Sequence, residues 1–316
     1  GEPVGGWTQP DEVRSMIDAL RTPDERFADL PDFPWTPRCI DDLAGYEGLR
    51  CAVIDEGPKS GAPTFLCLHG EPTWSFLYRR MIPVFLASGA RVVAPDLFGF
   101  GRSDKPVDDA VYGFHFHRRM LLALVERLDL KDITLVVQDW GGLIGLTLPV
   151  DEGFRGRLSR LIAMNTTLAT GSPPSEGFLA WRAYAKANPD LAVGALLGRG
   201  TPHLTAAERA AYDAPFPDIR YKAGVRAFPE RVMTDAGMEG ITESLAAQAF
   251  WSKEFKGQVF MAIGEADMVL GPPVMEDLRR CLPACPEPLR IPEAGHFVQE
   301  WGGPVAEAAL RSFASR

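Results

Sequence analysis

From residue 51 onward, the apolar residues of the chain fall into two kinds of pattern. Short, continuous, β-rich apolar runs occur at 51–55, 64–68, 91–95, 133–137, 160–164, 258–263 and 287–291. Longer stretches with helical spacing lie between them, at 75–88, 115–129, 140–149 and 303–314. Buried strands that alternate with helices are typical of a mostly parallel sheet covered by helices.

Three stretches depart from this alternation. The runs 51–55 and 64–68 are too close together for a crossover helix, so we expect an antiparallel start to the sheet. The first forty residues are rich in Pro and Asp, and they predict one helix at 11–20 and otherwise irregular structure. Between about 167 and 250 the pattern predicts short helices without strands, one of them opened by a capping box of Thr205 and Glu208.

Composition and charge exclude several classes of protein. The 316 residues are 46% hydrophobic and 24% charged, as in an ordinary globular protein, and the formal net charge of −9 offers no basic stripe for nucleic acid. The longest candidate for a membrane span, 133–150, is broken by Gln138 and Asp139, so we expect no membrane segment. The first residues show no signal-peptide pattern, and the five scattered cysteines suggest reduced thiols, which together predict a cytoplasmic protein. Cys281 and Cys285 lack a second pair or a nearby His, so no metal site is expected.

The candidate chemistry lies at strand ends, where open α/β sheets bind their ligands. The strand 133–137 runs directly into Asp139 and a helix start that contains Gly141 and Gly142. This is the strand–turn–helix arrangement of a nucleophile elbow, with Asp139 at the nucleophile position and Val137 where the usual motif has Gly. A helix-capping Asp would give the same pattern, so this segment alone leaves both interpretations open.

Two later strand ends supply a candidate base and acid. His296 lies in a loop after the last strand, at the base position of the chain order nucleophile, acid, His. Asp267 follows the strand 258–263 and is suited to orient the imidazole and stabilise its cation. Glu265, in the same loop, is a rival carboxylate that sequence position does not exclude.

The loop after the strand 64–68 provides a fourth signal. Its residues include Gly70, Glu71 and Pro72, and in this fold an N–H of this loop joins the N–H after the nucleophile in an oxyanion hole. Those amides would belong to Glu71 and Trp140. Each signal is modest alone, but their order at four strand ends predicts an α/β-hydrolase fold: a mostly parallel eight-stranded sheet flanked by helices, with an inserted all-helical cap.

The type of nucleophile narrows the reaction. A carboxylate that attacks an sp³ carbon displaces a leaving group and becomes an alkyl ester. His296 would then activate water to attack the ester carbonyl, with the oxyanion hole stabilising the tetrahedral intermediate. Ordinary esterases and peptidases carry Ser or Cys at the elbow, so those activities are not expected.

Longer stretches around these residues resemble the haloalkane dehalogenase family. The stretches are 69–79, 95–104, 137–142 and 295–300, within a similarity that runs from about residue 21 to the C-terminus. The chain most resembles the subfamily with Glu in the H-G-x-P loop and the catalytic acid after the penultimate strand, which favours Asp267 over Glu265. Asn165 lies where some relatives carry that acid, and an amide cannot fill the role. The resemblance implies that Trp140 and Trp181 donate their indole N–H groups to the departing halide.

The resemblance also implies the domains, the pocket and the partners. The main domain is expected at 1–166 and 248–316, with the cap at 167–247. The substrate is expected to be a small apolar haloalkane, with water as the second reactant, halide as a product and no cofactor, and the chain is expected to be a monomer. The implied apolar pocket consists of Leu143, Phe178, Phe228, Pro229, Val232 and Val269.

Three alternatives stay open at this point. An epoxide hydrolase shares the Asp, the His and the lid, and takes its proton donor from cap tyrosines such as Tyr184, Tyr212 or Tyr221. A fluoroacetate dehalogenase needs an Arg beside the nucleophile, where this chain has Trp140. A non-catalytic ligand-binding protein on the same scaffold is expected to lack one of the three catalytic groups.

Overall fold

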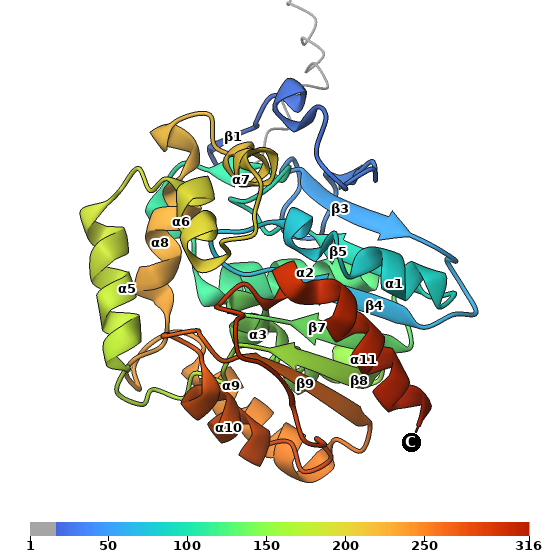
Figure 1. Ribbon diagram of the computed structural model, residues 1–316. Helices are drawn as coiled ribbons and strands as arrows, with labels where there is room; N and C mark the ends of the chain where they lie inside the picture. The colour runs from blue at the N-terminus through green and yellow to red at the C-terminus, as the bar shows by residue number, and fades with distance from the viewer. Residues whose placement is uncertain (1–16, 316) are drawn as a thin grey trace, which may run out of the picture.

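The central sheet contains eight strands in the order β10-β9-β8-β7-β4-β5-β3-β2. The computed structural model describes residues 17–315 (Figure 1). Neighbours from β10 to β5 pair in parallel, whereas β3 is antiparallel to β5 and β2 is antiparallel to β3. The strands are Arg38–Ile40 (β2), Cys51–Glu56 (β3), Thr64–Leu68 (β4), Arg91–Pro95 (β5), Ile133–Val137 (β7), Leu158–Met164 (β8), Gln258–Gly264 (β9) and Leu289–Ile291 (β10). The mostly parallel eight-stranded sheet is therefore confirmed.

Helices cover both faces of this sheet. Figure 1 shows α1 and α11 on one face and α2 and α3 on the other. In contact with strands are α1 on β5, α11 on β9 and α3 on β7. The helices are Ile82–Ala87 (α1), Phe114–Arg127 (α2), Trp140–Gly145 (α3), Glu152–Arg155 (α4), Glu176–Ala187 (α5), Val193–Gly200 (α6), Ala206–Asp213 (α7), Ala223–Arg231 (α8), Ile241–Ala249 (α9), Pro272–Arg280 (α10) and Gly302–Ala314 (α11).

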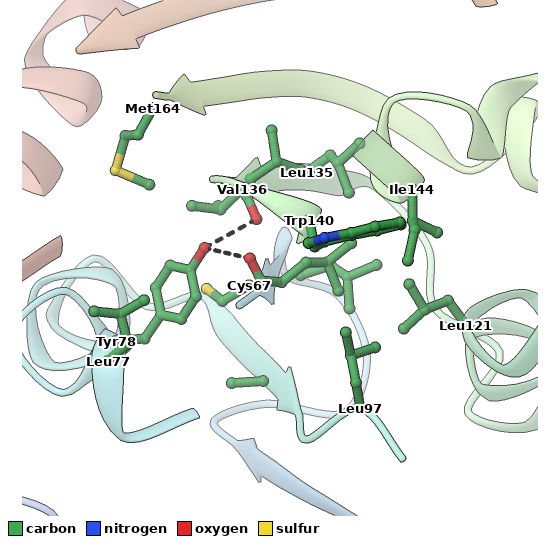
Figure 2. Packing of buried hydrophobic residues seen from close by; sticks show 14 of the residues in the cluster. Cys67, Leu77, Tyr78, Leu97, Leu121, Leu135, Val136, Trp140, Ile144 and Met164 are labelled. Atoms are coloured by element: carbon green, nitrogen blue, oxygen red, sulfur yellow. Dashed lines mark hydrogen bonds between the residues drawn. The ribbon is translucent and has the colours of Figure 1, made fainter. Parts of the chain in front are cut away.

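The central strands are buried on both faces, which explains their unbroken apolar runs. Every residue of β4, β5 and β7 is buried. Figure 2 shows the aliphatic and aromatic side chains packed around them, with Trp140 among them. One polar group is satisfied within this core: the Tyr78 hydroxyl donates to the carbonyl of Leu68 at 2.7 Å and lies 3.4 Å from that of Val136 (Figure 2). A phenol can enter an apolar core only with such a partner.

The predicted strands from 51 onward are all found, but three details differ. The strands β3 and β4 run in opposite directions without pairing, because β5 lies between them and pairs with both. The predicted helix 75–88 is two segments, a 3₁₀ turn at Ser75–Tyr78 and α1. The predicted helix 140–149 ends at Gly145 and is followed by a 3₁₀ turn, Leu148–Val150.

The N-terminal expectation is wrong for the part that the structure describes. Residues 11–16 of the predicted helix 11–20 lie outside the described residues, and Ala19–Leu20 form a strand, β1, that pairs with Lys105–Pro106 (β6). Strand β2, at the edge of the main sheet, was not expected either. Both strands are short and gain their order from partners distant in the sequence, so local periodicity does not reveal them.

Four helices, α5 to α8, gather at one end of the sheet (Figure 1). Helix α5 packs against α8, and α6 packs against α7. The predicted capping box is present: the Thr205 hydroxyl accepts from the Glu208 N–H, and the Glu208 carboxylate accepts from the Thr205 N–H. Helix α9 begins inside the expected cap range but packs against the 3₁₀ turn Leu148–Val150 of the sheet domain. No helix within residues 17–315 is long and apolar enough to cross a bilayer.

Helix α3 begins in unusually close contact with the strands beside it. A Cβ atom at Gly141 would overlap the backbone carbonyl of Leu68, and one at Gly142 would overlap the side chain of Thr166. The backbone of β4 is buried and hydrogen-bonded within the sheet, so it has little room to move. These glycines therefore set how closely the turn before α3 approaches the strand ends.

We predict that Gly141→Ala lowers the free energy of unfolding by about 1–3 kcal/mol, because the new methyl group meets a fixed backbone atom. The matched control is Gly303→Ala in α11, where a Cβ atom meets nothing within 4 Å. That change should leave stability unchanged or raise it by about 0.5–1 kcal/mol, because Ala favours a helix. Urea denaturation of both variants measures the difference, and equal stabilities would contradict the packing argument.

Candidate active site

Asp139 occupies the turn between β7 and α3 with a backbone conformation that side chains rarely adopt. Its φ is 52° and its ψ is −132°. Such a conformation costs about 1–3 kcal/mol in a residue other than Gly and is maintained only by surrounding contacts. Here the Asp139 N–H donates to the carbonyl of Asn165 at 2.9 Å, and the Asp139 carbonyl accepts from the Thr166 hydroxyl at 2.8 Å. These bonds fix the turn to the segment that follows β8.

The two carboxylate oxygens of Asp139 have different partners. Oδ2 accepts the backbone N–H of Glu71 at 2.8 Å, and Oδ1 lies 2.9 Å from Nε2 of His296. Gly70 lies directly against this carboxylate, and a Cβ atom there would overlap it. The loop after β4 therefore approaches Asp139 closely enough for a backbone amide to reach it.

The other side of the His296 ring contacts Asp267. The distance from Nδ1 to Oδ2 of Asp267 is 2.8 Å. The same carboxylate accepts the Val269 N–H at 2.8 Å and the Asn165 side-chain amide at 3.1 Å. The Asp267 side chain is 2% exposed, so its anion depends on these donors rather than on water. The structure thus brings Asp139, His296 and Asp267 into one hydrogen-bonded row.

The rival carboxylate Glu265 has different surroundings. Its Oε2 lies 3.9 Å from Arg290, and its backbone N–H donates to the carbonyl of Ile291. Asp267 is the carboxylate that contacts the imidazole.

Charge and burial act against each other in this row. Burial alone lowers the pKa of His296, but the charges and hydrogen bonds of Asp267 and Asp139 outweigh burial and raise that pKa well above its usual value. Burial alone raises the pKa of Asp267, and the His296 cation and the three donors hold it at about 2. The imidazolium is therefore stabilised between two carboxylates.

Glu71, the Glu of the H-G-x-P loop, is a buried acid. It is 5% exposed, and its Oε1 has no hydrogen-bond partner among residues 17–315. Burial, with the nearby Asp139 charge, raises the pKa of Glu71 well above its usual value. Burial and the neighbouring charge therefore both favour the neutral acid of Glu71, beside the Asp139 carboxylate that its own backbone N–H binds. In the sequence, the place of Glu71 in a loop expected beside the nucleophile is the signal that points to this buried acid.

A cavity of about 430 Å³ opens beside Asp139 and His296. Trp140 and Trp181 both line it, as do four residues of the expected pocket, Leu143, Phe178, Val232 and Val269. The cavity wall also includes residues that the sequence analysis did not assign to the pocket: Pro72, Thr167, Tyr184, Leu196, Arg199, Gly200, Leu270 and Phe297.

Phe228 and Pro229 do not line this cavity, contrary to the expectation. Phe228 is 1% exposed and packs behind Trp140, with 4.7 Å between the ring centroids, so it supports the wall rather than forming it. Pro229 is buried within α8. A helical segment near the site was identified correctly, but which of its residues reach the cavity depends on the rotation of the helix.

The three tyrosines considered as proton donors lie in different surroundings. Tyr184 lines the cavity, and its hydroxyl accepts from Arg199 at 2.7 Å. The Tyr212 hydroxyl donates to Glu300 in a separate buried cluster, and Tyr221 does not line the cavity. Two of the three are therefore placed away from any substrate in this cavity.

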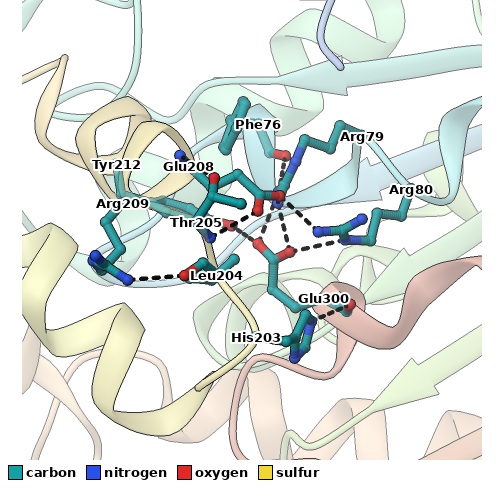
Figure 3. A network of polar contacts seen from close by, with 10 residues as sticks. All are labelled: Phe76, Arg79, Arg80, His203, Leu204, Thr205, Glu208, Arg209, Tyr212 and Glu300. Carbon is teal, nitrogen blue, oxygen red and sulfur yellow. Dashed lines mark hydrogen bonds and ion pairs between the residues drawn. The ribbon is translucent and has the colours of Figure 1, made fainter. Parts of the chain in front are cut away.

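A second polar cluster connects helix α7 to the loop that carries His296 (Figure 3). The Arg79 guanidinium donates to both Glu300 oxygens, at 2.8 and 2.7 Å, and also bonds Glu208 of α7. Arg80 bonds the same two carboxylates at 3.1 and 2.6 Å. Arg79 and Glu300 have fully buried side chains, and two cations balance two anions. Burial alone would raise the pKa of Glu208, yet the Thr205 N–H and the two guanidinium groups lower it to about 2.

Neither a metal cluster nor a disulfide accompanies the site in the part of the chain that the structure describes. Residues 17–315 contain no group of three or more His, Cys, Asp or Glu side chains arranged to hold a metal ion. Cys39, Cys51, Cys67 and Cys281 are free thiols.

Comparisons with known proteins agree with this geometry. Residues 63–303 match the alpha/beta hydrolase fold family. The haloalkane dehalogenase of Mycolicibacterium paratuberculosis is 41% identical over 300 residues, which cover 92% of this chain and 97% of that protein. Haloalkane dehalogenase 1 of Mycobacterium tuberculosis (strain H37Rv) is 44% identical over 293 residues, which cover 91% of this chain and 95% of that protein.

A solved structure shows the same relationship in three dimensions. The tetrameric haloalkane dehalogenase DpaA from Paraglaciecola agarilytica NO2 is 54% identical and superposes with a TM-score of 0.92. The match covers 94% of this chain and 99% of DpaA. The chain belongs to the haloalkane dehalogenase family of α/β hydrolases.

Proposed function

We propose that this chain hydrolyses the carbon–halogen bond of small haloalkanes to an alcohol, a halide ion and a proton. Asp139 is the nucleophile and His296 is the general base. Asp267 is the carboxylate that orients the imidazole and stabilises its cation. The observation that carries the proposal is the Asp139 carboxylate, which faces a largely apolar cavity while the Glu71 N–H and His296 each hold one oxygen. A carboxylate in that position attacks carbon, because no Ser or Cys stands at the elbow.

In the first step, one Asp139 oxygen attacks the carbon atom that bears the halogen. We assign the attack to Oδ1, because Oδ2 is held by the Glu71 N–H in the position of an ester carbonyl oxygen. A C–O bond forms as the C–X bond breaks, and the halide leaves with the bonding electron pair. Trp140 and Trp181, which both line the cavity, are the proposed halide donors, because an indole N–H donates without accepting and its ring tolerates a weakly hydrated anion.

In the second step, water attacks the carbonyl carbon of the ester while Nε2 of His296 takes its proton. The oxyanion forms on Oδ2, where the backbone N–H groups of Glu71 and Trp140 are the proposed donors. The C–O bond between the ester carbonyl carbon and the alkoxy oxygen then breaks, and the leaving alkoxide takes the proton held by Nε2 of His296 and departs as the alcohol. The new carboxylic acid of Asp139 loses the second proton of the water to solvent, which restores the carboxylate and accounts for the proton released overall.

The electrostatics of the row explain how His296 becomes a base only after the first step. In the free enzyme, two carboxylates raise the pKa of the imidazole. Alkylation turns Asp139 into a neutral ester, so one of the two anions is removed and the pKa of His296 falls. The imidazole is then able to accept the proton of water.

The finer assignments rest on the same contacts. We propose that the chain belongs to the subfamily with Glu71 in the H-G-x-P loop and its acid after β9, which the contact between Asp267 and His296 supports. Asn165 would then support Asp267, since its side-chain amide donates to that carboxylate.

We also propose that the segment 167–247 acts as the cap, with α5 and α6 supplying Phe178, Trp181 and Arg199 to the cavity. DpaA is tetrameric, and we expected a monomer here; light scattering on the purified chain distinguishes the two.

The two-step scheme predicts different failures for two variants. Asp139→Ala should release no halide from a small bromoalkane, because no ester forms. His296→Ala should complete the first step and stop, so intact mass spectrometry should show one added alkyl group on the chain. Halide release by Asp139→Ala, or an absence of adduct in His296→Ala while the parent is active, would contradict the scheme.

The charge row predicts the titration of the base. Asp267→Asn removes one anion from the imidazole, so the pKa of His296 should fall and its ring should lose its proton at lower pH than in the parent. Glu265→Gln is the matched control, because that carboxylate pairs with Arg290 and should leave the titration nearly unchanged. NMR titration of the ring proton of His296 measures both, and equal falls in the two variants would reject Asp267 as the partner.

The halide assignment predicts a selective loss in Trp181→Phe, which keeps an aromatic wall but removes one N–H donor. We expect kcat/KM for bromoalkanes to fall about tenfold, as for a lost hydrogen bond to a charged group. Bromide should also bind more weakly in a fluorescence titration. Trp35→Phe, at a position that does not line the cavity, should match the parent. Unchanged bromide affinity in Trp181→Phe would remove that residue from the halide site.

A further inference from the structure

The outer part of the active-site cavity carries a cation that the apolar-substrate prediction does not explain. Arg199, near the end of α6, lines the cavity together with Tyr184 of α5. Both side chains are exposed, whereas Trp140 at the inner end is 4% exposed. The guanidinium thus lies between solvent and the apolar wall that leads to Asp139.

The position of this guanidinium is set by an aromatic neighbour. Its Nη2 donates to the Tyr184 hydroxyl at 2.7 Å, and its central carbon lies 5.2 Å from the centroid of the Tyr184 ring. The Tyr184 ring in turn lies 6.5 Å from that of Trp181. An arginine stacked in this way keeps its direction, and it has further N–H donors for a ligand.

Among the described residues, Arg199 also has no carboxylate partner. Within 4.0 Å of its guanidinium, residues 17–315 supply no carboxylate. The contrast is with Arg79 and Arg80, which share two carboxylates between them. The chain has a net charge of −9, so an anion that approaches the cavity meets general repulsion and only a local cation favours it.

We propose that the cavity accepts substrates that carry a carboxylate at the end remote from the carbon–halogen bond, and that Arg199 binds this carboxylate. The substrate class is the ω-haloalkanoates, with the haloalkyl end at Asp139 and the methylene chain along Phe178, Leu196 and Val232. This inference rests on the proposed function and adds a second recognition point to it. A planar guanidinium matches a carboxylate with two parallel hydrogen bonds.

The size of the effect follows from the exposure of the pair. A carboxylate at the mouth keeps part of its hydration, so the attraction is that of an exposed ion pair with good geometry rather than of a buried one. We therefore expect a change of about threefold to tenfold in kcat/KM, mainly through KM. The chemical step at Asp139 should be unaffected, because Arg199 does not touch the carboxylate row.

The experiment compares matched substrates that differ only in charge. A series of ω-bromoalkanoates of increasing chain length is assayed beside the corresponding ω-bromoalkanamides and simple 1-bromoalkanes. The parent should prefer the carboxylate to the amide over a limited range of chain lengths. Arg199→Gln should reduce the ratio of kcat/KM for the carboxylate to kcat/KM for the amide by about threefold to tenfold, while Arg199→Lys should keep part of that preference.

A matched control separates local binding from general attraction. Lys186→Gln removes the same charge from the cap at an exposed position of α5 that does not line the cavity. It should leave the preference for the carboxylate in place. Tyr184→Phe removes the hydrogen bond that orients Arg199, so it should weaken the preference while the cation remains.

Several results would overturn the inference. They are equal losses in Arg199→Gln and Lys186→Gln, equal losses for charged and neutral substrates, or turnover of 1-bromoalkanes by a parent that rejects every ω-bromoalkanoate. A change in bromide inhibition as large as the change in carboxylate preference would assign Arg199 to the halide product instead. Failure to turn over any halogenated substrate would contradict the proposed function itself, so the two failures are distinguishable.

Discussion

The close approach of two backbone segments determines most of what this site is able to do. The turn after β7 and the loop after β4 meet where Gly70 and Gly141 have no side chains, and the Glu71 N–H thereby comes within 2.8 Å of the Asp139 carboxylate. The bonds of the Asp139 backbone to Asn165 and Thr166 hold that turn at a positive φ, and the Asp139 side chain lines the cavity. The strained turn and the oriented carboxylate thus both depend on how closely the segments after β4, β7 and β8 pack together.

The constraint concentrates ionisable groups, and their protonation states follow from one another. Asp267 and Asp139 flank His296 and raise its pKa, and burial and Asp139 raise the pKa of the nearby Glu71 carboxyl, which favours its neutral form. If Glu71 ionised, a third anion would lie beside Asp139 without a compensating partner, since its Oε1 has none among the described residues. With both carboxylates ionised, the row holds one more anion than cation. In the proposed mechanism, ester formation at Asp139 removes that extra anion and so lowers the pKa of His296.

Sequence reasoning located this row because its members follow separate strand ends in a fixed order. Asp139 and Asp267 follow buried apolar strands and His296 follows the half-buried strand β10, and the parallel sheet brings such ends to one edge. The same reasoning missed β1 and β2, whose order depends on distant partners. It also placed Phe228 in the cavity wall, where helix rotation decides the outcome, and did not anticipate Arg199 at the cavity. The reactive residues at strand ends can be recognised from the local sequence. Which residues form the cavity wall depends instead on how the helices between β8 and β9 pack.

A second ionic cluster joins helix α7 to the two loops of the active site. Arg79 follows the loop of Glu71, Glu300 follows the loop of His296, and Glu208 lies on α7 of the cap. A buried cluster of this kind adds little net stability, because desolvation offsets the attraction between its charges. It does penalise any arrangement that separates one partner, since a single buried charge would then be left unpaired. The cluster is therefore better suited to holding α7 in one position against both active-site loops than to stabilising the fold, and α6, which carries Arg199, is positioned in turn by its packing on α7.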